Sequence, residues 1–240
     1  MTGLPLISPL IDFLYPRFCV SCGAIVRLGE GHICWDCLAA MDRVEAPFCR
    51  RCGDPVFGRI ETEYCCSACW RRRPAFASAR SVFRYRGGLK RAIQAFKYAN
   101  GLYLAHDFVE WLTACVHAEF SDERFDAVAY VPLHAWKERR RSYNQARVLA
   151  MGLGRRLGLP VLRNSLRRVR PTGTQTGLNM YKRAVNVRGA FDVVRPGWVE
   201  SRRLLLVDDV MTTGATVNEV SRVLKDAGAA SVHVVTVARG

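Results

Sequence analysis

The chain has 240 residues, 50% of them hydrophobic, and a formal net charge of +15. No stretch approaches the roughly 20 consecutive apolar residues that a membrane-spanning helix needs, which excludes membrane insertion. Residues 1–75 carry 9 basic and 8 acidic side chains, whereas residues 76–240 carry 27 and 13. The positive field of the second part is expected to attract phosphates, small or polymeric, with a basic but inert surface as the alternative.

Cysteine usage divides the chain at the same place as the charge. Nine of the ten cysteines lie between Cys19 and Cys69. This asymmetry predicts a small cysteine-dependent module over residues 1–75, followed by a globular domain over residues 76–240. The apolar N-terminus is a poor signal peptide, because it lacks a basic start and is interrupted by Asp12 and by prolines. We therefore expect a cytoplasmic protein, in which clustered cysteines are more often metal ligands than disulfides.

The module contains four Cys-x-x-Cys pairs: Cys19 and Cys22, Cys34 and Cys37, Cys49 and Cys52, and Cys66 and Cys69. Two such turns on adjacent hairpins complete a tetrahedral shell of four thiolates, which suits zinc. We predict tandem ribbons paired in sequence order and about two structural zinc ions per chain. Iron–sulfur ligation and redox dithiols fit four regular pairs less well. Cys65 could replace Cys66 as a ligand, and His32 is expected to be a surface residue.

The second domain alternates strand patterns with helix patterns. Apolar runs and alternation predict strands over residues 76–86, 125–133, 203–209 and 231–238. Helical spacing of apolar residues predicts helices over residues 87–100, 102–120, 142–159 and 216–229. This order predicts an α/β fold, a mainly parallel sheet flanked by helices on both faces. Ligands of such sheets bind beyond the carboxyl ends of the strands, where "VPLH" (131–134) and Asp208–Asp209 stand.

The stretch "LLLVDDVMTTGAT", residues 204–216, combines an anion cradle with two acids. Its threonine hydroxyls, its backbone N–H groups, the conformational freedom of Gly214 and the N-terminus of the following helix make a monophosphate site. Asp208 and Asp209 are unsuited to phosphate, but they suit a neighbouring diol or a hydrated magnesium ion. A sugar phosphate satisfies both halves of the site at once.

This stretch resembles the phosphoribosyl-pyrophosphate (PRPP) motif of type I phosphoribosyltransferases. The resemblance implies a type I phosphoribosyltransferase-like domain that binds PRPP, with magnesium, through the matching positions Asp208, Asp209, Met211, Thr212, Thr213, Gly214, Ala215 and Thr216. An acid pair that merely ends a strand does not explain "TTGAT". A Walker A loop is also absent from the sequence, which weakens a nucleotide-hydrolase interpretation.

The layout of the whole chain is similar to the ComF family, named for competence for DNA uptake. The cysteine module is followed by "FKY", "VPLH", "RRRSYNQA", "RPTGTQTGL", "NVRGAF" and the PRPP loop. The resemblance implies a double zinc ribbon before a phosphoribosyltransferase domain, and a late role in natural transformation with single-stranded DNA and a DNA helicase as partners. Where competence is unknown, it implies a broader metabolic role. The family pattern would place glycine and an aromatic residue before "NQA", where this chain has Ser142 and Tyr143.

Transfer from PRPP releases pyrophosphate, so a second basic cradle is required. The "VPLH" segment and nearby basic residues are the candidates: Lys97, Pro132, Leu133, His134, Arg139 and Arg141. A solvated basic face is the alternative for each of these charges. Residues 168–191 fit a loop that closes over the site, with Arg170, Gln175, Lys182 and Arg183 able to reach phosphates, or simply a long surface loop.

The acceptor cannot be identified, because no segment specifies a nucleobase, an amine or a general base. Three functions therefore remain open. The first is a phosphoribosyltransferase, and the second is a single-stranded-DNA-binding adaptor or helicase partner whose PRPP site is regulatory. The third is a zinc-ribbon interaction module that docks a transferase-like domain onto a helicase. The basic second domain, with "RRR" at residues 71–73 and 139–141, supports contact with a phosphate backbone.

Overall fold

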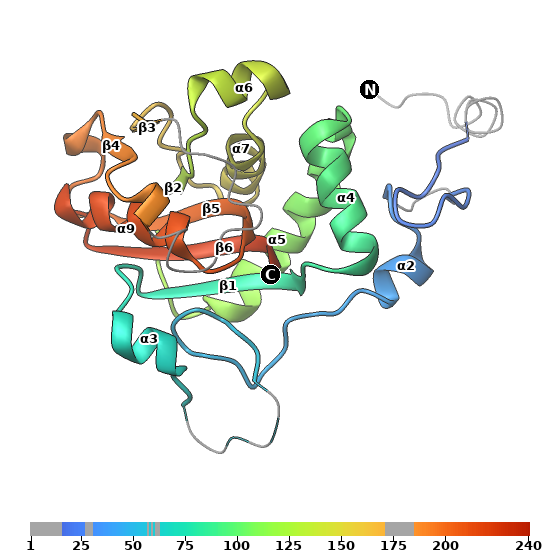
Figure 1. Ribbon diagram of the computed structural model, residues 1–240, viewed down its shortest axis with the longest axis horizontal. Coiled ribbons are helices and arrows are strands. Elements are labelled where there is room, and N and C mark those ends of the chain that lie inside the picture. The colour runs from blue at the N-terminus through green and yellow to red at the C-terminus, as the bar shows by residue number, and fades with distance from the viewer. Residues whose placement is uncertain (1–15, 27–30, 57, 59, 61–62, 171–184) are drawn as a thin grey trace.

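Four parallel strands form the central sheet in the order β1–β6–β5–β2 (Figure 1). The computed structural model describes residues 16–26, 31–56, 58, 60, 63–170 and 185–240. The strands are β1 (Ser78–Arg84), β2 (Ala127–Tyr130), β5 (Arg203–Met211) and β6 (Ser231–Arg239). Strands β2 and β6 are buried almost throughout, as expected for a sheet covered on both faces. The predicted α/β fold with a parallel sheet is confirmed.

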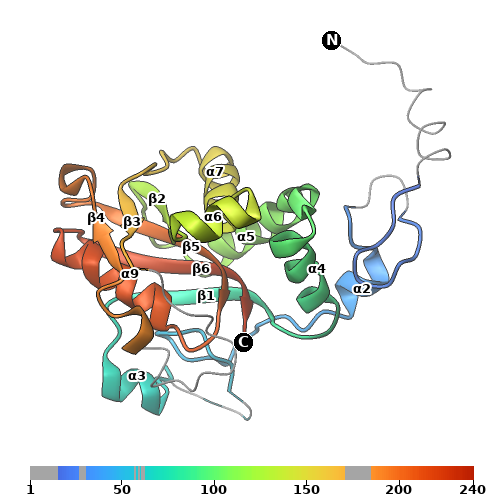
Figure 2. The same ribbon diagram turned by 45° about the horizontal axis from the view of Figure 1, so that its top comes forward.

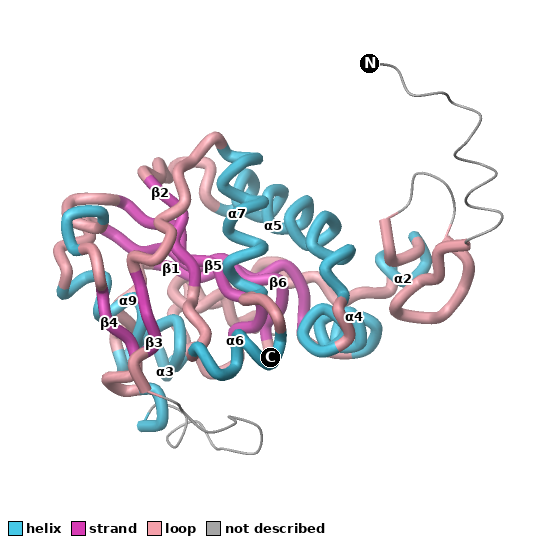
Figure 3. The backbone as a smooth tube through the Cα atoms, turned by 90° about the horizontal axis from the view of Figure 1, so that it is seen from above, coloured by secondary structure: helices cyan, strands magenta, loops and turns pink. Residues whose placement is uncertain are grey.

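Helices cover both faces of this sheet (Figures 1 and 3). Helices α5 (Ala105–Glu119) and α7 (Gln145–Leu157) pack together on one face, and α9 (Ala215–Asp226) packs against β5 and β6 on the other. Helix α4 (Gly87–Tyr98) follows β1 and leads through η1 (Gly101–Leu104) into α5. In α4 the buried residues recur at helical spacing, which gives the helix one apolar face. No helix among the described residues is long and apolar enough to cross a bilayer.

Several short elements escaped the sequence patterns. Helix α6 (Ala135–Arg141) contains no buried residue, so it has no apolar stripe to detect. Strands β3 (Leu166–Arg168) and β4 (Phe191–Val193) form a separate antiparallel pair, followed by η2 (Pro196–Trp198). Strand β5 also runs two residues past its predicted end, because its pairing with β6 continues to Met211.

The N-terminal module consists of two ribbons that repeat one local pattern. In both, the glycine after the first cysteine pair donates its N–H to the first cysteine's carbonyl, at 2.8 Å for Gly23 to Cys19 and for Gly53 to Cys49. Each second cysteine pair sits at a short helix, α2 (Trp35–Ala39) or α3 (Ser67–Arg72). The first ribbon lies beside α4 and the second beside β1 (Figure 2). The predicted boundary at residue 75 lies three residues before β1 and stays a prediction.

Candidate functional site

Eight cysteines form two clusters in the N-terminal module. The four sulfur atoms of each cluster lie within 4.8 Å of one another: Cys19, Cys22, Cys34 and Cys37 in the first, and Cys49, Cys52, Cys66 and Cys69 in the second. The ribbons therefore pair in sequence order. The second cluster includes Cys66 rather than its neighbour Cys65, whose sulfur is 3.9 Å from a backbone carbonyl. The backbone N–H of His32 donates to Asp107 at 2.7 Å, which docks the first ribbon on α5.

The spacing of the sulfur atoms fits zinc. A tetrahedral site with zinc–sulfur bonds of about 2.3 Å has sulfur–sulfur edges of about 3.8 Å. The Cys22 and Cys34 sulfurs are 3.7 Å apart, and the Cys52 and Cys66 sulfurs are 3.8 Å apart. In each cluster a backbone N–H also points at a sulfur, as from Cys66 to Cys49 at 3.3 Å, which stabilises a thiolate. Both clusters are therefore suited to a structural zinc ion.

Asp208 and Asp209 lie on β5, near the carboxyl edge of the sheet. Asp209 is 7% exposed, and its Oδ1 is 2.9 Å from the Nζ of Lys97, at the end of α4. Burial disfavours the Lys97 ammonium, but the Asp209 carboxylate outweighs this and raises the pKa of Lys97 above its ordinary value. Lys97, expected in the pyrophosphate cradle, is thus paired with the second acid of the motif.

Asp208 is half-buried, and the pKa of its carboxyl lies well above the ordinary value. Burial raises the pKa of its carboxyl to about 7, and the adjacent charge of Asp209 contributes in the same direction. Lys97 and Arg168 oppose the shift without cancelling it. A diol or a cation placed against this carboxyl would favour its ionised form.

The turn after β5 leads directly into the N-terminus of α9. Residues Asp208 and 210–217 line a shallow pocket at the N-terminus of α9. Gly214 adopts a φ of +75°, a conformation that glycine takes without strain, and it caps α9. The Thr213 hydroxyl accepts a hydrogen bond from the N–H of Ala215 at 3.4 Å. The helix dipole and the amides of this turn make the pocket attractive to a monophosphate.

The "VPLH" segment lies next to this pocket, because β2 and β5 are parallel neighbours. The N–H of Val131 donates to the carbonyl of Val207 at 3.1 Å, immediately before Asp208. Pro132 is buried and Leu133 is half-buried. The His134 ring accepts a hydrogen bond from the N–H of Trp136 at 3.3 Å, so it caps α6.

The two arginine candidates of α6 differ. Arg139 is exposed. Arg141 donates to the Tyr98 hydroxyl at 2.8 Å and to Gln145 at 3.1 Å, which joins α6 to α4 and α7.

Two cations near the acids were missed by sequence reasoning. Burial lowers the pKa of Lys137, on α6, and the positive charges of Arg168 and Arg141 lower it further. Burial also lowers the pKa of Arg168, on β3, although the charge of Asp208 opposes this shift. Lys137 and Arg141 on α6 and Arg168 on β3 therefore lie in one another's field, and Arg168 also acts on Asp208. No sequence pattern could have found them, since α6 and β3 carry no clear periodicity.

The "RRRSYNQA" motif is explained by backbone geometry. Ser142 ends α6 with a φ of +66°, the left-handed conformation that favours glycine, which accounts for the glycine expected there. The Tyr143 hydroxyl donates to the carbonyl of Phe96. Asn144 is buried, donates to the carbonyl of Val131 at 3.2 Å and accepts from the N–H of Arg147 at 3.2 Å, capping α7. The motif thus holds the "VPLH" segment against α7.

Part of the predicted closing loop falls outside the described residues, namely Gln175, Lys182 and Arg183. Arg170, which precedes the gap, donates to the carbonyl of Arg188, which follows it. The N–H of Gly189 donates to the buried carboxylate of Glu219 on α9 at 2.7 Å. The two ends of the segment are therefore held together beside α9.

Two family models match the chain, "Double zinc ribbon domain" over residues 10–70 and "Phosphoribosyl transferase domain" over residues 140–240. Competence protein F of Haemophilus influenzae is 31% identical over 225 residues, covering 92% of this chain and 96% of the relative. DNA utilization protein YhgH of Escherichia coli K12 is 31% identical over 222 residues, covering 91% and 95%. A solved structure of Bacillus subtilis glutamine PRPP amidotransferase is 22% identical, covers 60% of this chain and 30% of that one, and has a TM-score of 0.41. The chain belongs to the competence protein F (ComF) family, in which a double zinc ribbon precedes a phosphoribosyltransferase domain.

Proposed function

We propose that the protein binds PRPP at the carboxyl edge of β5 and transfers its phosphoribosyl group to an acceptor. The observation that carries the proposal is the meeting of three features at one edge of the sheet. These are the acid pair Asp208–Asp209, the amide-lined turn 212–216, and Arg168, whose charge acts on Asp208 and which shares its field with Lys137 and Arg141 on α6. A sugar carrying one terminal phosphate and one pyrophosphate is complementary to all three.

Each feature has a distinct role in this proposal. The amides of residues 212–216 and the N-terminus of α9 bind the 5′-phosphate. The carboxylates of Asp208 and Asp209 accept hydrogen bonds from the ribose hydroxyls, directly or through water on a metal ion. The cations of α6 and β3 stabilise the charge that develops on the departing pyrophosphate as the bond to C1 breaks. The Lys97 ammonium, 2.9 Å from Asp209, balances the charge of that carboxylate.

The carboxylates of Asp208 and Asp209 suit magnesium only when phosphates of the substrate supply further ligands. Magnesium is commonly held by one or two carboxylates plus substrate phosphates, and the site offers Asp208 and Asp209. When bound, the ion would neutralise phosphate charge and favour the leaving group. A divalent cation would also favour the ionised form of Asp208, whose pKa is near neutrality.

Measurement of pyrophosphate release distinguishes a phosphoribosyltransferase from a protein that binds PRPP only as a regulatory ligand. The protein is incubated with PRPP, magnesium and a panel of nucleobases and amines, and pyrophosphate is measured. We expect acceptor-dependent release that Asp208→Asn reduces, in line with its weaker PRPP binding. Tight PRPP binding without release from any acceptor would favour a regulatory site. Absence of PRPP binding would reject both versions of the proposal.

The relatives' names suggest the process in which the protein acts. Because two relatives are named for competence and for DNA utilization, we extend the proposal to a role in handling incoming DNA in the cytoplasm, with a DNA helicase as partner. The net positive charge of residues 76–240 supports contact with nucleic acid.

A specific surface favours single-stranded DNA as a second ligand. Tyr98, the last residue of α4, is 67% exposed, and Trp136, in the first turn of α6, is 55% exposed. The guanidinium of Arg141 lies 4.7 Å from the Tyr98 ring centroid, and that of Arg140 lies 5.6 Å from the Trp136 ring. Exposed aromatic rings beside arginines are platforms on which bases stack. The alternative function is therefore a DNA-binding adaptor that uses this surface.

Trp136→Ala is expected to weaken binding of a single-stranded oligonucleotide by roughly 1–3 kcal/mol, because it removes one stacking platform. Trp198→Ala is the matched control, since Trp198 is also exposed and has Arg195 4.5 Å from its ring, but it lies at η2. Fluorescence anisotropy at several salt concentrations measures both variants. Equal losses, or no measurable affinity of the wild type at physiological salt, would contradict this surface.

A further inference from the structure

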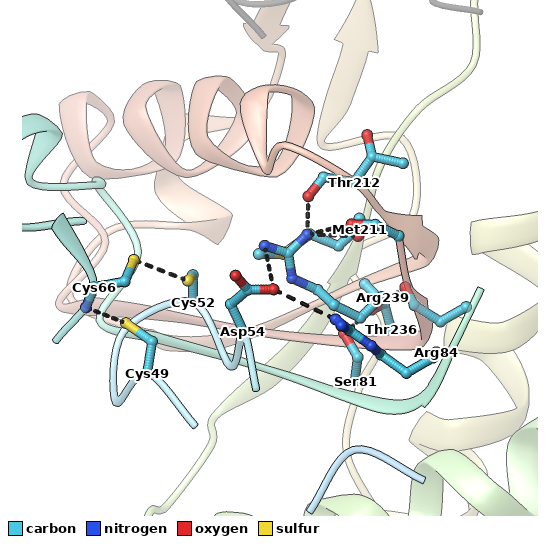
Figure 4. Close-up of polar contacts among 12 residues, drawn as sticks. Cys49, Cys52, Asp54, Cys66, Ser81, Arg84, Met211, Thr212, Thr236 and Arg239 are labelled. Carbon is cyan, nitrogen blue, oxygen red and sulfur yellow. Dashed lines mark hydrogen bonds and ion pairs between the residues drawn. The ribbon is translucent and has the colours of Figure 1, made fainter. Parts of the chain in front are cut away.

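A buried arginine of β6, Arg239, contacts the start of the turn formed by residues 212–216. Arg239, the last residue of β6, is 8% exposed. Its Nη1 donates to the carbonyl of Met211 at 3.2 Å, to that of Gly240 at 2.9 Å, and to that of Thr212 (Figure 4). Because the carbonyls of Met211 and Thr212 belong to the residues that begin the turn, the direction in which the turn's amides point depends on where Arg239 lies.

The second zinc ribbon fixes the other end of this guanidinium. Asp54 Oδ1 is 3.3 Å from Nη2 of Arg239 and 3.6 Å from Nη1 of Arg84 (Figure 4). Asp54 follows the Cys49–Cys52 turn, and its own carbonyl accepts a hydrogen bond from the N–H of Cys49 at 2.9 Å. The backbone turn that presents two thiolates to the metal therefore also positions the carboxylate that meets Arg239.

The ribbon cannot shift freely relative to the sheet. Gly53 has a φ of +64°, and a Cβ at this position would lie 2.5 Å from the carbonyl oxygen of Ala79 in β1. The N–H of Ala79 donates to the carbonyl of Arg51 at 2.7 Å. Asn218, in the first turn of α9, accepts a hydrogen bond from the N–H of Ala75 at 2.8 Å. The ribbon is thus attached to the sheet and, through the segment that follows it, to the helix at which the phosphate would bind.

Packing alone does not hold the turn on this side. A cavity of about 300 Å³ separates the second ribbon from the turn, and it is lined by Cys66, Phe76, Met211, Gly214 and Arg239, among others. Among the described residues, the start of the turn is tied to β6 by the Arg239 guanidinium and by the N–H of Gly240, which donates to the carbonyl of Met211 at 3.0 Å. The turn has room to move if those contacts are lost.

We infer that Asp54 is a positioning residue for the donor-phosphate turn, acting through Arg239, so that the second zinc ribbon forms part of the PRPP site. This inference rests on the proposed function for its ligand, but the coupling of ribbon to turn is a property of the chain itself. A folded second ribbon is then a condition for tight phosphate binding. The first ribbon docks on α5 through Asp107.

The direction in which phosphate binding changes on removal of Asp54 tests the inference, because a purely electrostatic role predicts the opposite change from a positioning role. Asp54 carries negative charge near a site for an anion. If it served only as a charge, its removal would strengthen phosphate binding, because Arg239 would then be unneutralised. If it positions Arg239, removal lets the guanidinium and the turn shift, and phosphate binding weakens.

The test compares Asp54→Ala with Asp42→Ala. The Asp42 side chain is 41% exposed and pairs with Arg86, whereas that of Asp54 is 44% exposed, so the two carboxylates are matched in exposure but only Asp54 meets Arg239. Amide hydrogen exchange is measured for residues 212–216, and ribose 5-phosphate and pyrophosphate are titrated separately by calorimetry. Zinc content is determined for each variant.

We expect Asp54→Ala to speed exchange of these amides and to weaken ribose 5-phosphate binding roughly tenfold, a size usual for coupling between two sites. Asp54→Ala should leave pyrophosphate binding unchanged. Asp42→Ala should change neither the amide exchange nor the binding of ribose 5-phosphate. If the alanine variant loses zinc, Asp54→Asn carries the comparison, with a smaller effect of the same sign. Unchanged exchange, or tighter ribose 5-phosphate binding, would overturn the inference. Wild-type protein that binds no ribose 5-phosphate would instead reject the proposed function, while exchange would still report the coupling.

Discussion

Asp208→Asn is expected to weaken PRPP binding roughly 10–100-fold, as removal of a charged hydrogen-bond acceptor for ribose hydroxyls does. The amide keeps the shape of the side chain but cannot become an anion. It therefore accepts hydrogen bonds from the diol more weakly, and it binds a metal ion less well. Calorimetry with PRPP, with and without magnesium, measures the loss. Since the amide turn is untouched, the affinity for inorganic phosphate should be retained. Unchanged PRPP affinity would remove Asp208 from the site.

The stability of the same variant serves as its control. In the unfolded chain an aspartic acid titrates near 3.9, whereas the pKa of Asp208 is raised to about 7 in the fold. The folded state therefore binds the proton more tightly, and this group's contribution to stability falls as pH rises from about 4 to about 7. The substituted asparagine has no proton to lose, so we expect Asp208→Asn to be more stable than wild type by about 1–2 kcal/mol at pH 8, allowing for solvent screening. Thermal unfolding at several pH values measures this difference, which should vanish near pH 4.

Asp209 requires a different design, because its partner is buried. Asp209→Asn alone leaves the Lys97 ammonium without its counter-charge, and breaking a buried ion pair in this way costs about 3–5 kcal/mol. A variant that combines Asp209→Asn with Lys97→Met removes both charges and should fold. We expect it to lose PRPP affinity as Asp208→Asn does. Full affinity in this variant would show that the pair is structural.

Removal of zinc is expected to unfold both ribbons. Metal binding at structural thiolate sites contributes about 10–16 kcal/mol at neutral pH, and a module this small cannot replace that with a core. Elemental analysis should find about two zinc ions per chain. A strong chelator should make the Cys19–Cys69 region sensitive to protease. Iron, or no metal at all, would contradict the prediction, as would ribbons that stay protected after chelation.

Long elements with one dominant pattern could be predicted from the sequence. Strands β5 and β6 contain long apolar runs in the sheet interior, and their neighbours in sequence are amphipathic helices, so the parallel sheet followed from periodicity. The cysteine pairs and the stretch "VDDVMTTGAT" are also local, since all their parts lie within a few residues. The ComF assignment drawn from such motifs is confirmed by the relatives.

The contacts that complete the candidate site are not local, and this is why they escaped prediction. Lys97 meets Asp209 across 112 positions of the chain, and Asp54 meets Arg239 across 185. The Lys137–Arg168 neighbourhood joins a short polar helix to a three-residue strand. Such pairs depend on the packing of separate elements, and one sequence holds no signal for them. The capping of α6 by His134, a residue expected at pyrophosphate, was missed for the same reason, since α6 itself was not predicted.

A crystal structure with PRPP and magnesium tests the central claim most directly. The account predicts the 5′-phosphate on the amides of residues 212–216, the ribose hydroxyls against Asp208 and Asp209, and the pyrophosphate toward Lys137 and Arg168. An empty turn at saturating PRPP, or PRPP bound elsewhere on the chain, would contradict the account.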